Sequence, residues 1–175
     1  MRDPRPHTGE PPALDLLNTR WAGAVPEDLL ADLDGLRLWL DLTGLTDRVP
    51  VDEHTLNALH AAREAVHTAV TTAEHAPLNR VLEHGRIRRE LTDEGPRDVP
   101  EVADPAWLPG WLAADNLLHL IAEAPHRIRQ CAHPECVLFF YDTSKNGTRR
   151  WHSMATCGNR AKAARHYQNS SSSNR

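Results

Sequence analysis

Four residues near the C-terminal end of the sequence, Cys131, Cys136, His152 and Cys157, constrain what this chain can fold into. They include all three cysteines of the protein, and they form two pairs with the same spacing of four intervening residues. The 15 residues between the pairs are basic and contain a turn signal. Zn²⁺ accepts three sulfurs and one imidazole nitrogen in a tetrahedral site, so this pattern predicts bound zinc.

The same pattern leaves two alternatives open. His133 lies inside the first pair and is a rival for the fourth position, and three buried cysteines beside an unrelated histidine would need no metal. Four protein ligands leave no position for a substrate, so we expect a structural rather than a catalytic zinc. Because thiols must lose their protons to bind, metal binding and folding of the segment should be coupled.

Charge is divided unevenly along the chain. Residues 1–125 contain 11 Lys or Arg and 22 Asp or Glu, a net charge of −11. Residues 126–175 contain 9 and 2, a net charge of +7, and together the two parts give the −4 of the whole chain. An acidic body followed by a basic segment indicates that the basic segment alone meets a polyanion.

The first 125 residues predict an α-helical domain. Leucines recur at helical spacing, Asp52 is placed to cap a long helix, and Gly44 to end the helix before it. A weaker pattern on either side of Asp93–Pro96 predicts a small β-hairpin. The expected helices are 28–43, 53–73, 78–83 and 109–123, and the expected hairpin strands are 86–92 and 97–102.

Residues 126–168 predict a small treble-clef-like zinc finger. Cys131 and Cys136 form its knuckle, 137–141 a strand, and Ser144–Gly147 the turn of a tight hairpin. Cys157 is expected to open a helix that runs to about Tyr167. Residues 169–175 are polar and predict a disordered tail, so the fold class is mainly α with an appended zinc finger.

The segment from Cys131 to Tyr167 resembles the CGNR zinc-finger family of bacterial proteins. The residues that match are the Cys131–Cys136 knuckle and the runs 140–144 (FYDTS), 149–151 (RRW), 153–156 (SMAT) and 157–162 (CGNRAK). The family usually has cysteine where this chain has His152. Upstream, residues 13–19 (ALDLLNT) are similar to the opening of the helical ABATE-type domain that precedes such fingers. The resemblance implies a bacterial transcription regulator that binds DNA.

Six basic residues of the finger are predicted to contact nucleic acid, because phosphate contacts need long cationic side chains on one surface. An ordinary solvated basic face, or docking of the finger on the acidic body, would use the same residues. Arg160 has a further alternative, since it lies close enough to Cys157 to bond the zinc thiolates. The six residues are Lys145, Arg149, Arg150, Arg160, Lys162 and Arg165.

Two polar groups of the helical domain are weaker candidates for binding. Asp15, Asn18, Thr19 and Arg20 could form a pocket for a small-molecule effector, although such residues equally often bond the local backbone. Three residues of the long helix share one face at metal-ligand spacing, namely His60, Glu64 and His67. No second Glu-x2-His accompanies them, so a solvated face is expected there.

The sequence contains no glycine-rich phosphate loop, nucleophile elbow or Ser/His/Asp set, so an enzyme is not expected. Its polar opening residues and short apolar runs predict a cytoplasmic protein without a membrane span. We therefore expect a transcription regulator that binds DNA through its zinc finger and that senses a small molecule or dimerises through its helical domain. The alternatives are a zinc-stapled protein- or RNA-interaction module and a small-molecule enzyme in the helical domain.

Overall fold

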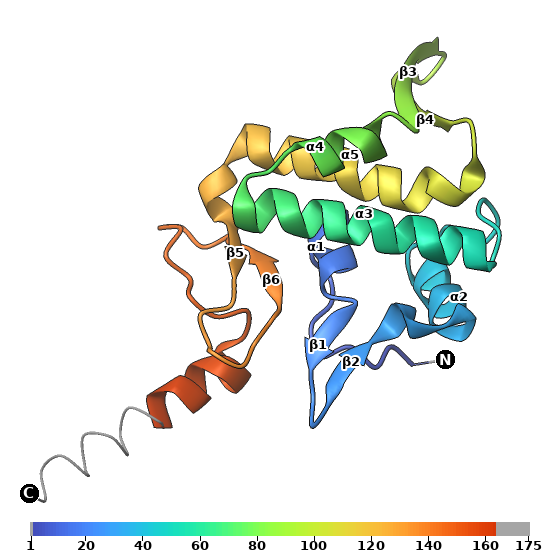
Figure 1. The fold of residues 1–175 in the computed structure, drawn as a ribbon. Helices are drawn as coiled ribbons and strands as arrows, with labels where there is room; N and C mark the ends of the chain where they lie inside the picture. The colour runs from blue at the N-terminus through green and yellow to red at the C-terminus, as the bar shows by residue number, and fades with distance from the viewer. Residues whose placement is uncertain (1, 164–175) are drawn as a thin grey trace, which may run out of the picture.

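The computed structural model describes residues 2–163. The predicted tail 169–175, Arg165 and the end of the predicted helix 157–167 lie outside the described residues. Within them the chain is mostly helical, with the zinc finger at one end of the helical domain (Figure 1), which confirms the predicted fold class. The helices are α1 (Pro12–Leu17), α2 (Leu33–Leu42), α3 (Glu53–Thr72), α4 (Ala76–Leu82) and α5 (Leu108–Glu123).

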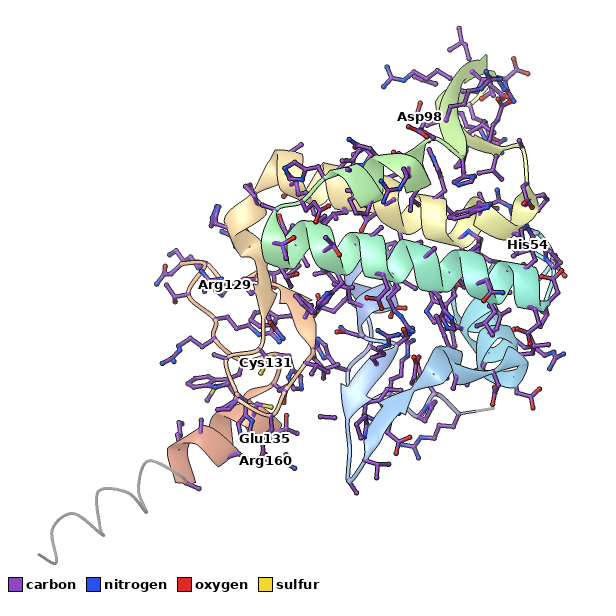
Figure 2. All side chains as sticks on the ribbon, viewed as in Figure 1. His54, Asp98, Arg129, Cys131, Glu135 and Arg160 are labelled. Atoms are coloured by element: carbon purple, nitrogen blue, oxygen red, sulfur yellow. The ribbon has the colours of Figure 1, made fainter. Side chains whose placement is uncertain are left out.

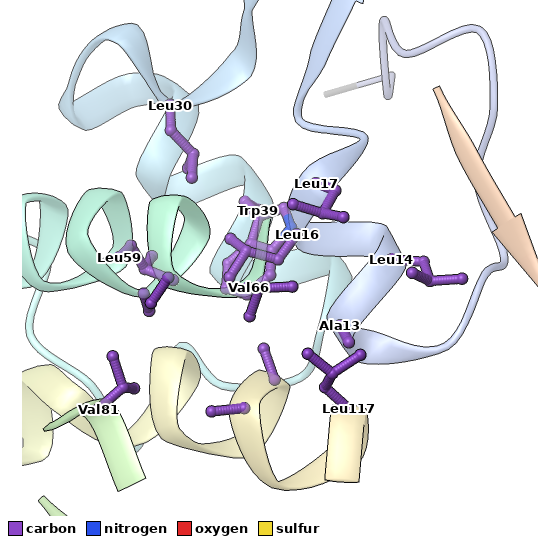
Figure 3. Close-up of a cluster of buried hydrophobic side chains, with 14 of the residues drawn as sticks. Ala13, Leu14, Leu16, Leu17, Leu30, Trp39, Leu59, Val66, Val81 and Leu117 are labelled. Carbon is purple, nitrogen blue, oxygen red and sulfur yellow. The ribbon is translucent and has the colours of Figure 1, made fainter. Parts of the chain in front are cut away.

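The long helix α3 lies along α5, and the shorter helices pack around this pair. α1 and α4 each contact both α3 and α5, whereas α2 contacts α3. Leu59 and Val66 of α3 point into the core with Leu16 of α1 and Leu117 of α5 (Figure 3), and all four are fully buried. A buried Leu or Val stabilises a fold by about 1.5–3 kcal/mol relative to an exposed one, so this cluster holds the helices together.

The long helix begins and ends at the positions that the sequence predicts. Asp52 caps it by accepting a hydrogen bond from the amide of Thr55 at 2.8 Å. At the other end Ala73 adopts a left-handed conformation with φ of 57°. Asp, Asn, Ser and Thr side chains are effective N-caps because they satisfy amides that have no partner within the helix.

The predicted single helix over 28–43 is wrong in its first turn. Asp28 instead caps a short 3₁₀ turn, η1 (Leu29–Ala31), by accepting from the amide of Leu30 at 2.9 Å. Asp32 then adopts an extended conformation and caps α2 through the amide of Gly35 at 2.9 Å. A side chain at Gly35 would collide with the carbonyl oxygen of Leu29, so the close approach of the two turns needs glycine there.

Two β-hairpins leave the helical body. β1 (Arg20–Ala22) pairs antiparallel with β2 (Pro26–Asp28), a hairpin that the sequence patterns did not predict. β3 (Gly85–Thr92) pairs with β4 (Gly95–Val102) in the register that joins Thr92 to Gly95. This hairpin confirms the one predicted from strands 86–92 and 97–102. Figure 1 shows β3 and β4 projecting away from the helices, at the opposite side of the molecule from the finger. Short 3₁₀ turns at Pro105–Trp107 (η2) and Pro125–Arg127 (η3) flank α5.

A buried arginine ties α3 to the segment that follows α1. Arg63 is only 1% exposed, and its guanidinium donates two hydrogen bonds of 2.7 Å to the carboxylate of Asp28 and one of 2.8 Å to the hydroxyl of Thr19. Burial alone would raise the pKa of Asp28, but the hydrogen bonds and charge of Arg63 outweigh it and lower the pKa. The carboxylate therefore remains ionised opposite the buried cation.

We expect Asp28→Asn to reduce the free energy of unfolding by on the order of 3 kcal/mol, because it leaves the buried Arg63 charge uncompensated. Asp34→Asn is the matched control, since Asp34 pairs with Arg37 at an exposed site and should contribute less than about 1 kcal/mol. Denaturant unfolding of the zinc-loaded proteins measures both. Equal stabilities of the two variants would contradict the role given to the Arg63–Asp28 pair.

Candidate metal centre and nucleic-acid interface

The finger is built on a short hairpin that brackets the cysteine knuckle. β5 (Ile128–Gln130) pairs antiparallel with β6 (Phe139–Tyr141). Between them the amide of Cys131 donates to the carbonyl of Leu138, and that of Cys136 to the carbonyl of His133, both at 2.9 Å. These bonds turn the chain back on itself and bring the first two cysteines to the same end of the hairpin.

The hairpin predicted from the strand 137–141 and the turn at Ser144–Gly147 is wrong, because β6 pairs with β5, which precedes it. The turn at Asn146–Gly147 does form, with Gly147 at φ of 60° and its amide bonded to the carbonyl of Ser144. No strand follows this turn in the described residues. Residues 148–151 instead cross back towards the knuckle, where the backbone carbonyl of Arg150 accepts a hydrogen bond from the amide of Ala132. The hairpin of the finger therefore closes around the metal ligands rather than around the Asn-Gly turn.

The ligand atoms of Cys131, Cys136, His152 and Cys157 converge. All four lie within 4.8 Å of one another, and the Sγ of Cys136 is 3.5 Å from the Nδ1 of His152. Standard Zn–S and Zn–N bond lengths give edges of about 3.6–3.8 Å in a tetrahedral Cys3His site, so the donor set and its spacing fit Zn²⁺. The cysteines are free thiols rather than disulfides. The protein thus contains a Cys3His zinc site.

His133 is not part of this group. Its Nδ1 accepts a hydrogen bond from the amide of Glu135 at 3.3 Å, within the turn of the knuckle, while His152 is buried among the cysteines. The structure therefore supports His152 as the fourth ligand. No other set of three or more metal-ligating residues converges within residues 2–163; in the helical trio, for example, His60 bonds the carbonyl of Leu30 and Glu64 pairs with Arg20.

The protonation chemistry of the metal-free cluster explains why its ligands need a cation. Burial raises the pKa of the Cys136 thiol to about 12, and the neighbouring Cys131 thiol adds to the shift. The pKa of Cys157 is raised as well, first by burial and then by Cys131. Burial, with help from the charges of His7 and Arg149, lowers the pKa of His152 to about 4. At neutral pH the imidazole is thus a neutral donor, and the thiols of Cys136 and Cys157 lose their protons only when a cation compensates the thiolate charge.

Two charged residues organise the loop between the ligand pairs. The buried carboxylate of Asp142 accepts from the amides of Ser144 and Arg149, each at 2.9 Å. The guanidinium of Arg149 donates to the carbonyls of Trp151 and His152 and lies over the ring of Phe140, 4.6 Å from its centroid. Arg149, predicted to contact nucleic acid, therefore also holds the backbone of a zinc ligand.

The other basic residues of the predicted interface are exposed. Lys145, Arg150, Arg160 and Lys162 all face solvent, and the Arg150 guanidinium lies 5.2 Å from the centroid of the Trp151 ring. Figure 2 shows Arg160 beyond Cys131, at the end of the finger that points away from α3. Among the described residues its side chain bonds neither a thiolate nor a carbonyl, and Arg165 lies outside the described residues.

The helical segment that carries Cys157 starts earlier than predicted. It begins with a π turn, η4 (Met154–Gly158), and continues as α-helix to residue 163. Ser153 caps it by accepting from the amide of Thr156 at 3.3 Å. Cys157 therefore lies within the first turn rather than opening the helix, and a thiolate there is still close to the amides that have no helical partner.

The buried side chain of Asn18 joins the finger to the helical domain. Asn18 donates to the carbonyl of Phe139 at 2.9 Å and accepts from its amide at 2.8 Å, so it pairs with β6 as another strand would. The ring of Phe139 belongs to the core of the helical domain. Glu10 adds a bond from the amide of Tyr141 at 2.8 Å and holds His7, whose ring lies 4.9 Å from that of His152.

The four polar residues predicted to hold an effector do not converge on one pocket. The Asp15 carboxylate bonds Arg5 and the indole nitrogen of Trp39, and the Thr19 hydroxyl bonds the carbonyl of Leu16. Arg20 reaches the surface, where it pairs with Asp28 and Glu64 and lines a cavity. Effector binding by Asp15, Asn18, Thr19 and Arg20 stays a prediction, and their contacts within the chain are structural.

Two functional features had only faint sequence signals. Arg63 lies between Leu59, Ala62 and Val66 on the apolar face of α3, and a charged residue inside such a stripe indicates a buried partner. The buried Asp142 had no signal beyond its place in the matched FYDTS run, since its partners are backbone amides.

We expect Asn18→Ala to destabilise the protein by about 2–4 kcal/mol, because it leaves both backbone groups of the buried Phe139 without a partner. Asn57→Ala is the control, as Asn57 is an exposed residue of α3. Denaturant unfolding measures the loss, and hydrogen exchange at the Phe139 amide should quicken in the Asn18 variant alone. Unchanged exchange there would contradict the docking role.

We expect His152→Ala to weaken zinc binding by more than about 100-fold, since losing only a partner of a ligand already costs about 10–100-fold. His133→Ala should bind one equivalent with unchanged affinity, because His133 is outside the cluster. Competition with a chromophoric chelator measures both. The assignment would be reversed if His133→Ala were the weaker binder.

Comparisons with known families agree with this geometry. The CGNR zinc finger family matches residues 127–170. The ABATE family, described as "Putative stress-induced transcription regulator", matches residues 10–124, more than half of the chain. A comparison with curated proteins finds no match, and none of the helices in residues 2–163 has the length and apolar character needed to span a membrane. The chain therefore belongs to the ABATE family and carries a CGNR zinc finger.

Proposed function

We propose that this protein binds DNA through the exposed basic residues of its zinc finger. The observation that carries the proposal is that the finger has two different faces. Phe139 and Tyr141 face the helical domain. Lys145, Arg150 and Arg160 face solvent. Within residues 2–163 none of these three pairs with a carboxylate of the helical domain, so their charges are available to phosphates. The membership of a transcription-regulator family supports DNA as the polyanion.

In this proposal zinc is structural. It would hold the knuckle, the loop that carries Lys145 and Arg150, and the helical segment that carries Arg160 and Lys162 in one arrangement. Arg149 would support the loop from within and contact phosphate only with the part of its side chain that stays exposed. Without the metal these segments share few contacts of their own, so DNA affinity should depend on zinc.

The helical domain would adjust the finger, either by binding a small molecule or by pairing two fingers in a homodimer in the cytoplasm. Asn18 and Glu10 join the two parts directly, so a change in the helical domain reaches β6 through hydrogen bonds. Sedimentation of the zinc-loaded protein with and without DNA separates the dimeric from the monomeric arrangement.

We expect the double variant Lys145→Ala, Arg150→Ala to bind duplex DNA more weakly, whatever the sequence, and to lower the slope of log K against log salt by about 2, near 0.9 per lost phosphate contact. Arg48→Ala, Arg80→Ala is the matched control, because both are exposed arginines of the helical domain. Fluorescence anisotropy across a salt series measures the slopes.

The same assay distinguishes the competing functions. Loss of binding after zinc removal supports a metal-organised reader of nucleic acid. Stronger competition by single-stranded or duplex RNA than by DNA would favour an RNA-binding module. No binding at low salt by zinc-loaded protein would overturn the proposal in favour of a protein-interaction module.

A further inference from the structure

A cavity of about 610 Å³ lies where the helical domain meets the finger. Its walls come from the end of α1, from the β1–β2 hairpin, from α3 and from the finger, so four separate parts of the chain line it. Cavities that bind small molecules in proteins span about 300–1,000 Å³ and often lie at such junctions. The cavity therefore has the size and the position of a ligand site.

Most of the wall is apolar. Trp21, Val25 and Pro26 contribute from the hairpin, and Val137 and Phe139 from the finger. Val25 and Val137 are 62% and 46% exposed, although both are hydrophobic and both line this one cavity. Apolar side chains left open to water on two facing elements indicate a surface that an apolar molecule would cover favourably.

Arg63 is the most deeply buried polar residue of the wall, and its hydrogen bonding is incomplete. Its two terminal nitrogens bond Asp28 and Thr19, whereas its Nε has no acceptor among the described residues. A buried donor without an acceptor costs about 1–3 kcal/mol, so such groups usually have a partner. An oxygen acceptor on a bound molecule would supply one.

The charges of the wall favour an uncharged ligand. Arg20 and Arg63 are the two arginines that line the cavity, and both already pair with carboxylates. Asp28 and Glu64 are the carboxylates that they occupy, and Glu27 is exposed on the hairpin. An anion would find no uncompensated cation, and a cation would have to displace an arginine from Asp28 or Glu64. Glu27 is exposed to water, where an ion pair contributes little to binding.

From these observations we propose that the cavity binds an uncharged, largely apolar small molecule of aromatic character that carries one carbonyl-type oxygen. Its apolar body lies between Trp21 and Phe139, and its oxygen accepts the hydrogen bond of the Arg63 Nε. Since α3 and β6 both contact the molecule, binding stabilises one docked arrangement of the finger. Ligand binding itself is independent of the proposed function, whereas an effect of the ligand on DNA affinity rests on it.

A matched set of four naphthalenes tests the ligand class on the full-length, zinc-loaded protein. They are 2-acetylnaphthalene, 2-ethylnaphthalene, 2-naphthoate and 2-naphthylmethylammonium, which share a ring and differ in the acceptor and the charge. Displacement of the neutral fluorescent probe N-phenyl-1-naphthylamine measures their affinities. We expect the ketone to bind about tenfold or more tightly than the hydrocarbon, the worth of one hydrogen bond to a charged donor, and both ions to bind more weakly than the ketone.

A pair of variants places the binding in this cavity. Ala22→Trp puts a large side chain into the wall of the cavity and should abolish binding of the probe and of the ketone. Ala61→Trp is the control, because Ala61 is exposed on α3 and does not line the cavity. Thermal unfolding shows whether each variant is folded. If Ala22→Trp does not fold, the affinities of the four naphthalenes for the unaltered protein still test the ligand class.

Three results would overturn the proposal: no binding of the probe or of any naphthalene, tightest binding of one of the ions, or equal binding by the two tryptophan variants. A hydrocarbon that binds as well as the ketone would overturn the role of Arg63. These measurements contain no DNA, so their failure is distinct from failure of the proposed function. If both hold, saturating ketone should change DNA affinity in the anisotropy assay, and DNA should change ketone affinity by the same factor.

Discussion

The Cys3His cluster is the constraint on which the finger depends. It joins a knuckle, a loop and a helical segment that share few apolar contacts. In the described part of the finger, Leu138 and Phe140 are the apolar side chains buried on the side away from the helical domain. A module this small rarely buries enough surface to fold alone. Burial raises the pKa of the Cys136 and Cys157 thiols, so these two ligands keep their protons at neutral pH when no metal is bound. We therefore expect zinc binding and folding of the finger to be coupled.

The dipeptide Phe139–Phe140 divides the finger between two environments. Because side chains alternate across a strand, Phe139 enters the core of the helical domain while Phe140 lies under the guanidinium of Arg149. Asn18 then pairs with both backbone groups of Phe139. The inner edge of the finger is therefore joined to the helices and its basic loop remains exposed, and the open cavity lies beside the joined edge.

Much of the fold could be predicted from local patterns. The helix caps at Asp52 and the hairpin beyond α4 follow from residue types that act on their immediate neighbours. The errors arose where a distant partner overrides a local preference. The turn at Asn146–Gly147 forms, but β6 does not pair across it. β6 pairs with β5 instead, because Cys131 and Cys136 between these strands must lie close enough to bind one metal ion. Asp28 lies outside the predicted helix, where its carboxylate accepts two hydrogen bonds from the buried guanidinium of Arg63.

The sequence by itself determined the three cysteine ligands, the basic character of the finger and the helical class of the body. Each follows from residue types and spacings along the chain, since coordination chemistry and net charge depend little on the rest of the fold. The choice of His152 over His133 as the fourth ligand came from the structure. Only the tertiary structure decided how Asn18 meets Phe139, how Arg63 meets Asp28 and where the cavity lies. Those contacts join residues 121 and 35 positions apart, and no local pattern specifies which distant backbone group or carboxylate will satisfy a buried polar side chain.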